Sequence, residues 1–345
     1  MAKKKKKSVN MSKKMWGAIS VAVVLIVSSV FVVSYMDKYE GKEQWIYIEK
    51  GYSEKQLQDT LTTKLGADFG EKVCRIWSMM GGDILESSGA YKVEPGITAW
   101  QVGRNMAKNY QSPITVTFNN VRTMEQLAQR MSKKMKFDEK DFLAVCDTML
   151  VREGFAPEEF AAVFFPDSYE FYWNATPQKV VQTMLKYYRK YWDEEKIAKA
   201  KSLGLTPIQV STLASIVEEE TNKSDERPKV ARLYLNRLDK KMKLQADPTL
   251  KFALGDFSIR RLLNEHKNVE SPYNTYKNEG LPPGPIRIVN KKTLDAVLDA
   301  PKHDYLYMCA KEDFSGYHNF AVGYDEHKAN AKRYQAELDR RNIKK

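Results

Sequence analysis

The order of hydrophobic and polar positions changes along the chain from one long apolar run to short strands and amphipathic helices. Residues 16–36 carry no charge over 21 positions, and a helix of that length spans a hydrocarbon core of about 30 Å. Lysines precede this run and mixed charges follow it, so the positive-inside rule predicts a cytoplasmic N-terminus. A cleaved signal peptide is the alternative, but the run is long and has no clear small-x-small cleavage site. We therefore predict a basic cytoplasmic arm at 1–15 and a single transmembrane helix at 16–36.

A strand–helix–helix–strand pattern follows the apolar run. An apolar strand is predicted at 44–50, and a helix begins after the N-cap Ser53 with Gln56 at the capping-box position. A second helix pattern covers 70–80, and a short strand covers 90–93. This small β-α-α-β unit is either a packing module or a carbohydrate-binding module, and its composition does not decide between the two.

The remainder of the chain alternates short strands with helices and has no internal repeat. A strand with alternating hydrophobicity is predicted at 114–120, and helical patterns follow it. The segment 164–173 is rich in aromatic residues around an Asp-Ser turn. It either closes a domain core or forms a wall on which sugars stack. The pattern as a whole predicts an α+β fold.

Composition and charge exclude several classes of protein. Hydrophobic residues make up 43% and charged residues 29% of the 345 residues, as in ordinary folded proteins. Seven lysines within the first fourteen positions account for much of the net charge of +12. The remaining charge of about +5 forms no arginine-rich patch, so nucleic-acid binding is not expected. The three cysteines include no CxxC pair and the four histidines no HExxH motif, so we expect neither a structural zinc site nor metal catalysis.

Three consecutive glutamates end a helix predicted after the Thr206-Pro207 start signal, in the stretch LASIVEEETN at 213–222. At 100° per residue, Glu220 projects near the edge of the apolar stripe formed by Val210, Leu213, Ala214 and Val217, whereas Glu218 and Glu219 turn toward the polar side. A carboxyl group against apolar surroundings favours its neutral form, which a general acid needs near neutral pH. The alternative for Glu220 is an ion pair at the helix end with Arg227 or Lys229.

Three later segments combine turn residues with polar and aromatic side chains. They are KLQADPTL at 243–250, ESPYNTYKNEGLPPGPI at 270–286 and GYHNF at 316–320. Proline stiffens the second segment and reduces the entropy cost of holding a ligand there. Hydroxyl, amide and aromatic groups together suit an oligosaccharide. The residues of interest in these segments are Gln245, Asp247, Tyr273, Asn274, Tyr276 and His318.

Together these motifs resemble the endolytic murein transglycosylases, the MltG or YceG-like family. The matching pieces run in order from about residue 44 to the C-terminus: FFPDSYEFY, LASIVEEET, ERPKVARLYLNRL, MKLQADPTL, SPYNTY, GLPPGPI, YLYMCA and HNFAV with Glu326-His327. The resemblance implies a LysM-like subdomain at 37–118 and a YceG-like catalytic domain at 119–345. It also implies that Glu220, which directly precedes a threonine, is the catalytic residue. Further cleft residues implied by position include Asn236 and Pro283, beside the residues of interest given above.

The resemblance implies an enzyme that cuts peptidoglycan glycan strands between N-acetylmuramic acid and N-acetylglucosamine and leaves a 1,6-anhydro end. It needs no cofactor, since one carboxyl group would act first as acid and then as base. We expect the protein at the cytoplasmic membrane with its catalytic domain on the extracytoplasmic, periplasmic side. There it would end strand elongation, and penicillin-binding, elongation and cell-division proteins are the expected partners.

Two other functions stay open at this level. A lysozyme-type muramidase would use Glu220 with Asp247 as its second carboxylate and would release reducing ends. A non-catalytic scaffold would bind the cell wall and would not depend on Glu220 at all.

Overall fold

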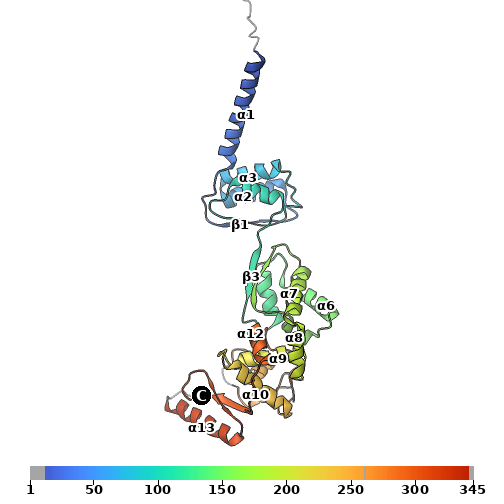
Figure 1. Ribbon diagram of the computed structural model, residues 1–345, viewed down its shortest axis with the longest axis vertical. Helices are drawn as coiled ribbons and strands as arrows, with labels where there is room; N and C mark the ends of the chain where they lie inside the picture. Colours follow the sequence, from blue (N-terminus) through green and yellow to red (C-terminus); the bar gives the residue numbers. More distant parts are fainter. Residues whose placement is uncertain (1–11, 260–261, 342–345) are drawn as a thin grey trace, which may run out of the picture. The chain divides into compact units, whose positions relative to one another are not determined.

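The computed structural model describes residues 12–259 and 262–341 (Figure 1). The chain forms two compact units, which are described separately here. The first contains the residues up to Ile114 together with Tyr172–Asn174, and the second contains Thr115–Phe171 and the residues from Ala175 onward. The chain therefore leaves the first unit once and returns to it briefly before it completes the second.

The N-terminal apolar run forms helix α1, Lys13–Tyr35. In the part of the chain that the structure describes, however, no helix is both long enough and apolar enough to cross a membrane. A span needs about 20 consecutive, predominantly apolar residues in one helix. The predicted transmembrane helix at 16–36 is therefore wrong. Most of the predicted basic arm, up to residue 11, lies outside the described residues.

The first unit contains the predicted strand–helix–helix–strand order. Its elements are β1 (Gln44–Ile48), α2 (Glu54–Leu65), α3 (Ala67–Met79), β2 (Gly89–Val93) and α4 (Ala99–Ala107). The two strands pair antiparallel, with Gln44 opposite Val93 and Ile48 opposite Gly89. The predicted capping box of Ser53 and Gln56 starts α2. Alternate residues of β1, Ile46 and Ile48, are buried with the apolar faces of the helices, as the period of two along a strand requires.

The second unit begins with a pair of strands and a group of helices. These elements are β3 (Ile114–Phe118), α5 (Met124–Ser132), α6 (Glu139–Arg152), the 3-10 helix η1 (Pro157–Val163), β4 (Asp167–Phe171), α7 (Pro177–Tyr191) and α8 (Glu194–Ser202). Strands β3 and β4 pair with each other. Phe164, Phe165, Tyr169 and Phe171 are all buried in the core of this unit. Of the two interpretations of 164–173, the structure thus supports core closure for these four residues.

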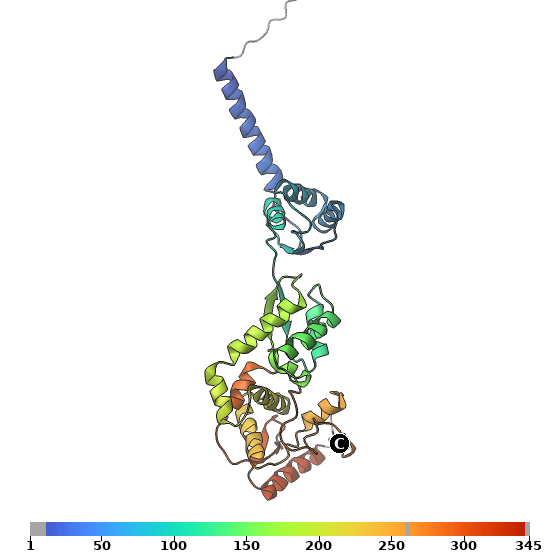
Figure 2. The same ribbon diagram turned by 90° about the vertical axis from the view of Figure 1, so that its right-hand side faces the viewer.

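The rest of the second unit surrounds one helix. Helix α9 (Pro207–Glu220) packs against α8, η1 and three later helices (Figures 1 and 2). The later elements are α10 (Arg227–Asp239), α11 (Asp247–Leu254), the 3-10 helix η2 (Glu265–Asn268), α12 (Lys291–Leu298), β5 (Tyr307–Ala310), β6 (His318–Ala321) and α13 (Tyr324–Arg340). Strands β5 and β6 pair antiparallel, with Ala310 opposite His318. The three glutamates therefore lie at the end of the most enclosed helix of the unit.

Candidate functional site

Helix α9 is buried around most of its circumference. Thr206 caps its start and Pro207 occupies the first turn, as predicted. The apolar stripe that includes Val217 is fully buried, but so are positions on the predicted polar face, among them Ser215 and Glu218. Glu218, which was predicted to turn toward the polar side of the helix, is therefore buried on that side. Hydrophobic periodicity cannot reveal this, because α12 and the loop before it cover the polar face of α9.

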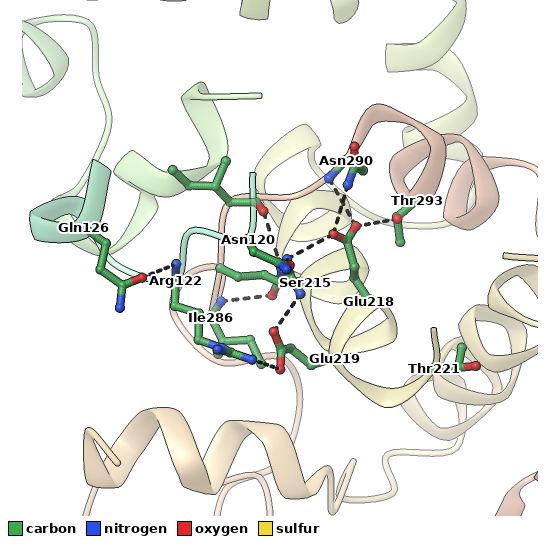
Figure 3. Close-up of polar contacts among 12 residues, drawn as sticks. Asn120, Arg122, Gln126, Ser215, Glu218, Glu219, Thr221, Ile286, Asn290 and Thr293 are labelled. Atoms are coloured by element: carbon green, nitrogen blue, oxygen red, sulfur yellow. Dashed lines mark hydrogen bonds and ion pairs between the residues drawn. The ribbon is translucent and has the colours of Figure 1, made fainter. Parts of the chain in front are cut away.

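Glu218 lies in a dense set of hydrogen bonds and ion pairs (Figure 3). Its carboxylate accepts hydrogen bonds from the Thr293 hydroxyl at 2.5 Å and from the Asn290 backbone N–H at 3.1 Å. The guanidinium groups of Arg287 and Arg227 lie 3.4 Å and 3.9 Å from it. A buried carboxylate is stable only when its oxygens are satisfied in this way. Glu218 therefore joins α9 to α12 and has the role of a structural anion.

Glu219 is likewise held by arginine. One carboxylate oxygen lies 2.7 Å from Nη1 of Arg287, and the other lies 2.9 Å from Nη2 of Arg122. Arg287 also donates to the Asn120 side chain at 2.8 Å. Figure 3 shows these contacts joining the segment after β3 to the end of α9, with Thr221 lying apart from them. We call Glu218, Glu219, Arg122 and Arg287 the arginine cluster.

Glu220, one residue further along α9, has a different environment. Its Oε1 accepts a hydrogen bond of 2.6 Å from the Tyr234 hydroxyl of α10. Among the described residues it forms no ion pair with Arg227 or Lys229, which the alternative interpretation required. Burial raises the pKa of Glu220 to about 7, because desolvation penalises the anion; the Tyr234 hydrogen bond lowers this pKa, and the Asp247 charge raises it. A carboxyl group of this kind is suited to donate a proton near neutral pH.

Glu220 faces a cavity of about 370 Å³ within the second unit. Helices α9, α10, α11 and α13, strands β5 and β6, and the loops around 244 and 276 supply its lining. The lining residues are Glu220, Leu233, Tyr234, Arg237, Leu244, Gln245, Asp247, Tyr276, Met308, Cys309, Ala310, His318 and His327. Segments more than 100 residues apart in the chain thus meet at one carboxyl group.

The structure brings five of the sequence-selected residues to this cavity: Glu220, Gln245, Asp247, Tyr276 and His318. Gln245 has a left-handed backbone with φ of 50°, and its N–H donates to the carbonyl of Thr275 at 3.1 Å. Asp247 follows at the start of α11 and accepts a hydrogen bond of 2.5 Å from the Tyr276 hydroxyl. Burial, and then this hydrogen bond, raise the pKa of Tyr276. Tyr276 and Asp247 therefore form a second fixed polar pair beside Glu220.

The other four selected residues lie outside the lining. Asn236 donates to the carbonyl of His303 at 2.6 Å, and Asn274 is fully buried and donates to the carbonyl of Val269 at 2.8 Å. Tyr273 packs its ring against Phe252, and Pro283 is exposed on its loop. The two asparagines hold loop backbones in place, which is a structural use of the same polar groups that would suit a sugar.

Three other polar residues of the cavity were not selected from the sequence: Tyr234, Arg237 and His327. Tyr234 and Arg237 are three positions apart in LYLNRL, a spacing that places them on one face of a helix. Arg237 is buried, donates from Nε to the carbonyl of Leu306 at 2.6 Å and from Nη1 to that of Leu244 at 2.8 Å. Desolvation, and then the charge of Arg237, lower the pKa of His327. The helical spacing was a usable signal for Arg237, and the Glu326-His327 pair among the family motifs was one for His327.

Glu226 was also not selected, although it begins the ERPKVARLYLNRL motif. Its carboxylate is buried, and its Oε2 lies 2.8 Å from Nδ1 of His318 in the cavity wall. The described residues contain no group of three or more His, Cys, Asp or Glu side chains arranged to hold a metal ion. The carboxyl, hydroxyl and imidazole groups of the cavity can transfer protons and form hydrogen bonds.

Comparison with known proteins identifies relatives of this chain. The model of the YceG-like family matches residues 46–333. An endolytic murein transglycosylase from Bacillus subtilis is 33% identical over 224 residues, which cover 60% of this chain and 61% of that protein. One from Streptococcus pneumoniae is 30% identical over 168 residues, which cover 48% of this chain and 30% of that protein. A crystal structure of a YceG-like protein from Listeria monocytogenes has the same fold, with a TM-score of 0.55 at 24% identity over 84% of this chain and 98% of that one.

Proposed function

Because this chain belongs to the YceG-like family, as its motifs predicted, we propose that it is a peptidoglycan lytic transglycosylase. The curated relatives that match it are named endolytic murein transglycosylases, and the matched segments span 61% and 30% of their lengths. Glu220 carries the proposal, because it combines a cavity, a raised pKa of about 7 and a single neutral hydrogen-bond donor. The substrate is a glycan strand, cut between N-acetylmuramic acid and N-acetylglucosamine.

In the first step, protonated Glu220 donates its proton to the glycosidic oxygen as the bond to C1 breaks. The raised pKa keeps a substantial fraction of Glu220 protonated at neutral pH. The Tyr234 hydroxyl then stabilises the carboxylate that remains, since a hydrogen bond to the anion favours the anion. Tyr234 also holds the carboxyl group in one orientation toward the cavity.

In the second step, the C6 hydroxyl of the muramic acid attacks C1, and a base takes its proton. The product is a 1,6-anhydro end, and no water is consumed. The nucleophile belongs to the substrate, so its proximity replaces a second enzymatic carboxylate. In the simplest form of this mechanism the Glu220 carboxylate is that base.

A lysozyme-type muramidase is the second candidate, and Asp247 is the observation that favours it. Asp247 lines the same cavity and raises the pKa of Glu220 through its charge. As in two-carboxylate glycosidases, it would act on water or on C1. Its hydroxyl partner Tyr276 would hold it in place for either role.

We further propose that the reaction takes place outside the cytoplasm, where peptidoglycan strands lie, and that it ends the elongation of nascent strands. Penicillin-binding, elongation and division proteins are the partners that this role would require. The first unit would act as a LysM-like module that holds the strand. Its small antiparallel strand pair and two intervening helices are compatible with that role.

The test uses the full-length protein and its Glu220→Gln variant on nascent and mature peptidoglycan. Mass spectrometry then identifies the product ends. Ends lighter by one water than hydrolysis products, formed by the natural protein and absent with the variant, are the expected result. Glu219→Gln is the matched control, because Glu219 is the adjacent glutamate and belongs to the arginine cluster. Full-weight reducing ends would replace the proposal with the muramidase, and cleavage by neither protein would leave a wall-binding scaffold.

A further inference from the structure

His318 and Glu226 form a polar pair that the mechanism above does not use. The buried Glu226 accepts hydrogen bonds from the backbone N–H of His318 at 2.8 Å and from the hydroxyl of Thr221 at 2.9 Å. The His318 ring nitrogen Nδ1 lies 2.8 Å from the same carboxylate. Backbone and ring of one histidine are thus held by one carboxylate, which fixes the ring more firmly than a side-chain contact alone.

This pair is coupled to the proposed catalytic residue through the chain itself. Thr221, which donates to Glu226, directly follows Glu220 and ends helix α9. His318 and Glu220 also line the same cavity, and the charge of His318 is one of the influences that lower the pKa of Glu220. Glu226 therefore sets the positions of the end of α9 and of the His318 ring at the same time.

The hydrogen-bond partners of Glu226 determine which ring nitrogen of His318 is free. The backbone N–H and the Thr221 hydroxyl are donors to Glu226, and we assign Nδ1 of His318 the same role toward this carboxylate. The neutral ring then presents an unprotonated Nε2, which has no protein partner among the described residues. A histidine oriented by a buried carboxylate, with its second nitrogen free, has the arrangement of a general base.

We propose that His318 is a catalytic base that accepts the proton of the muramic acid C6 hydroxyl, with Glu226 as its positioning residue. This inference rests on the proposed function. The bond from C1 to the leaving oxygen breaks first; O6 then bonds to C1 from the face that the leaving group has vacated, and the O6 proton passes to Nε2. Glu220 supplies the proton on the leaving oxygen. The resulting Glu220 carboxylate and His318 cation return to their starting states when a proton passes between them through solvent.

Glu220 and His318 need opposite protonation states at the start of the reaction, so kcat/KM should depend on pH in a bell-shaped way. Glu220 must start protonated, so activity falls as the pH rises through about 7. His318 must start unprotonated, so activity also falls at acid pH. If Glu220 alone served as acid and base, the acid limb would be missing. Glu226 contacts His318 directly, and the ionisable groups that line the cavity with His318 are Glu220, Tyr234, Arg237, Asp247, Tyr276, Cys309 and His327.

The test compares kcat/KM against pH for the full chain, His318→Gln, Glu226→Gln and the control Asn319→Ala. We expect His318→Gln to lower the rate by about 10²–10⁴-fold, to lose the acid limb and to release more reducing ends, because water competes with the unassisted C6 hydroxyl. Glu226→Gln should lower the rate less than His318→Gln does, since the ring that accepts the proton remains and only the carboxylate that orients it is gone. Asn319 lies next to His318 on β6 and bonds to Glu312 instead, so its variant should keep the natural profile.

Added imidazole distinguishes a missing base from a damaged fold. His318→Ala should regain activity as imidazole is added, whereas a variant that is merely unfolded would not. Two results would overturn the inference. In the first, kcat/KM of the natural protein does not fall at acid pH. In the second, His318→Gln is slow but still loses activity at acid pH, and imidazole does not restore activity to His318→Ala. Full activity of Glu220→Gln would instead overturn the proposed function. The two failures are therefore separate.

Discussion

Adjacent glutamates at the end of α9 lie in opposite electrostatic environments. Glu218 and Glu219 share Arg287, whose guanidinium lies 3.4 Å and 2.7 Å from them. Among the described residues, Glu220 has only the neutral Tyr234 hydroxyl as its direct hydrogen-bond partner. The first two carboxylates are neutralised by cations, whereas burial dominates at the third and raises its pKa to about 7. The presence or absence of arginine at contact distance therefore separates a structural anion from the proposed proton donor.

This contrast is possible because helical geometry separates neighbouring residues. Successive side chains diverge by about 100° around a helix, so three consecutive glutamates face three different sets of elements. Glu218 faces α12, Glu219 faces the segment after β3, and Glu220 faces α10 and the cavity. Because other elements pack against α9 on every side, each glutamate contacts a different set of residues.

The largest expected effect comes from removing the proton of Glu220. Glu220→Gln keeps the shape and the oxygen that accepts the Tyr234 hydrogen bond, but it cannot donate a proton to the leaving group. We expect kcat/KM on glycan strands to fall by about 10²–10⁴-fold, as measured by release of soluble products. Glu219→Gln should retain activity in proportion to its folded fraction. Equal losses of kcat/KM in Glu220→Gln and Glu219→Gln would contradict the proposed difference between these two glutamates.

Removing the shared cation should affect stability instead of chemistry. Arg287→Leu leaves buried Glu218 without its closest guanidinium, and the free energy of unfolding should fall by about 3–5 kcal/mol. Urea denaturation measures this loss. The control is Arg189→Ala, which breaks the exposed ion pair with Glu153 and should cost less than about 1 kcal/mol. Similar losses in both variants would show that the arginine cluster is not a buried network.

The Glu220 carboxyl should give the natural protein a pH-dependent stability, which Arg287→Leu keeps and Glu220→Gln lacks. The folded-state pKa of Glu220 is raised from 4.5 to about 7, so the folded protein binds more protons than the unfolded chain between these values. The stability contributed by this group is complete below pH 4.5 and is lost as the pH rises to about 7. Relative to the natural protein, Glu220→Gln should therefore gain up to about 3 kcal/mol over that interval. Unfolding midpoints that keep a constant separation from pH 4 to 8 would refute this expectation.

The smallest expected effects are on the alkaline limb of the pH profile, where kcat/KM falls as the pH rises. Two variants should shift this limb in opposite directions. Tyr234→Phe removes a hydrogen bond that lowers the pKa of Glu220, so the limb should move to higher pH. Asp247→Asn removes a negative charge that raises it, so the limb should move to lower pH. Both variants are to be measured at low ionic strength, where the charge effect is strongest. Shifts in the same direction would mean that Glu220 does not control this limb.

Local signals predicted the secondary structure better than they predicted the environment of each side chain. The Ser53 capping box and the Thr206-Pro207 start signal are short-range patterns, and both helices begin where these patterns place them. The transmembrane helix was the principal error, because the apolar run predicted a span that no helix among the described residues supports. Asn236 and Asn274 were chosen as sugar ligands, yet their amides hold loop carbonyls. Residue type alone does not tell these two uses apart.

By itself, the sequence determined the order of most helices and strands, the family and the choice of Glu220 among three glutamates. These depend on periodicity, caps and motifs, which act over a few residues. Only the tertiary structure decided that Glu218 is buried, that Arg287 joins two glutamates, and that Glu226 and His318 meet beside Glu220. These contacts join residues up to 92 positions apart. Burial and charge neutralisation depend on such distant neighbours, and no local pattern encodes them.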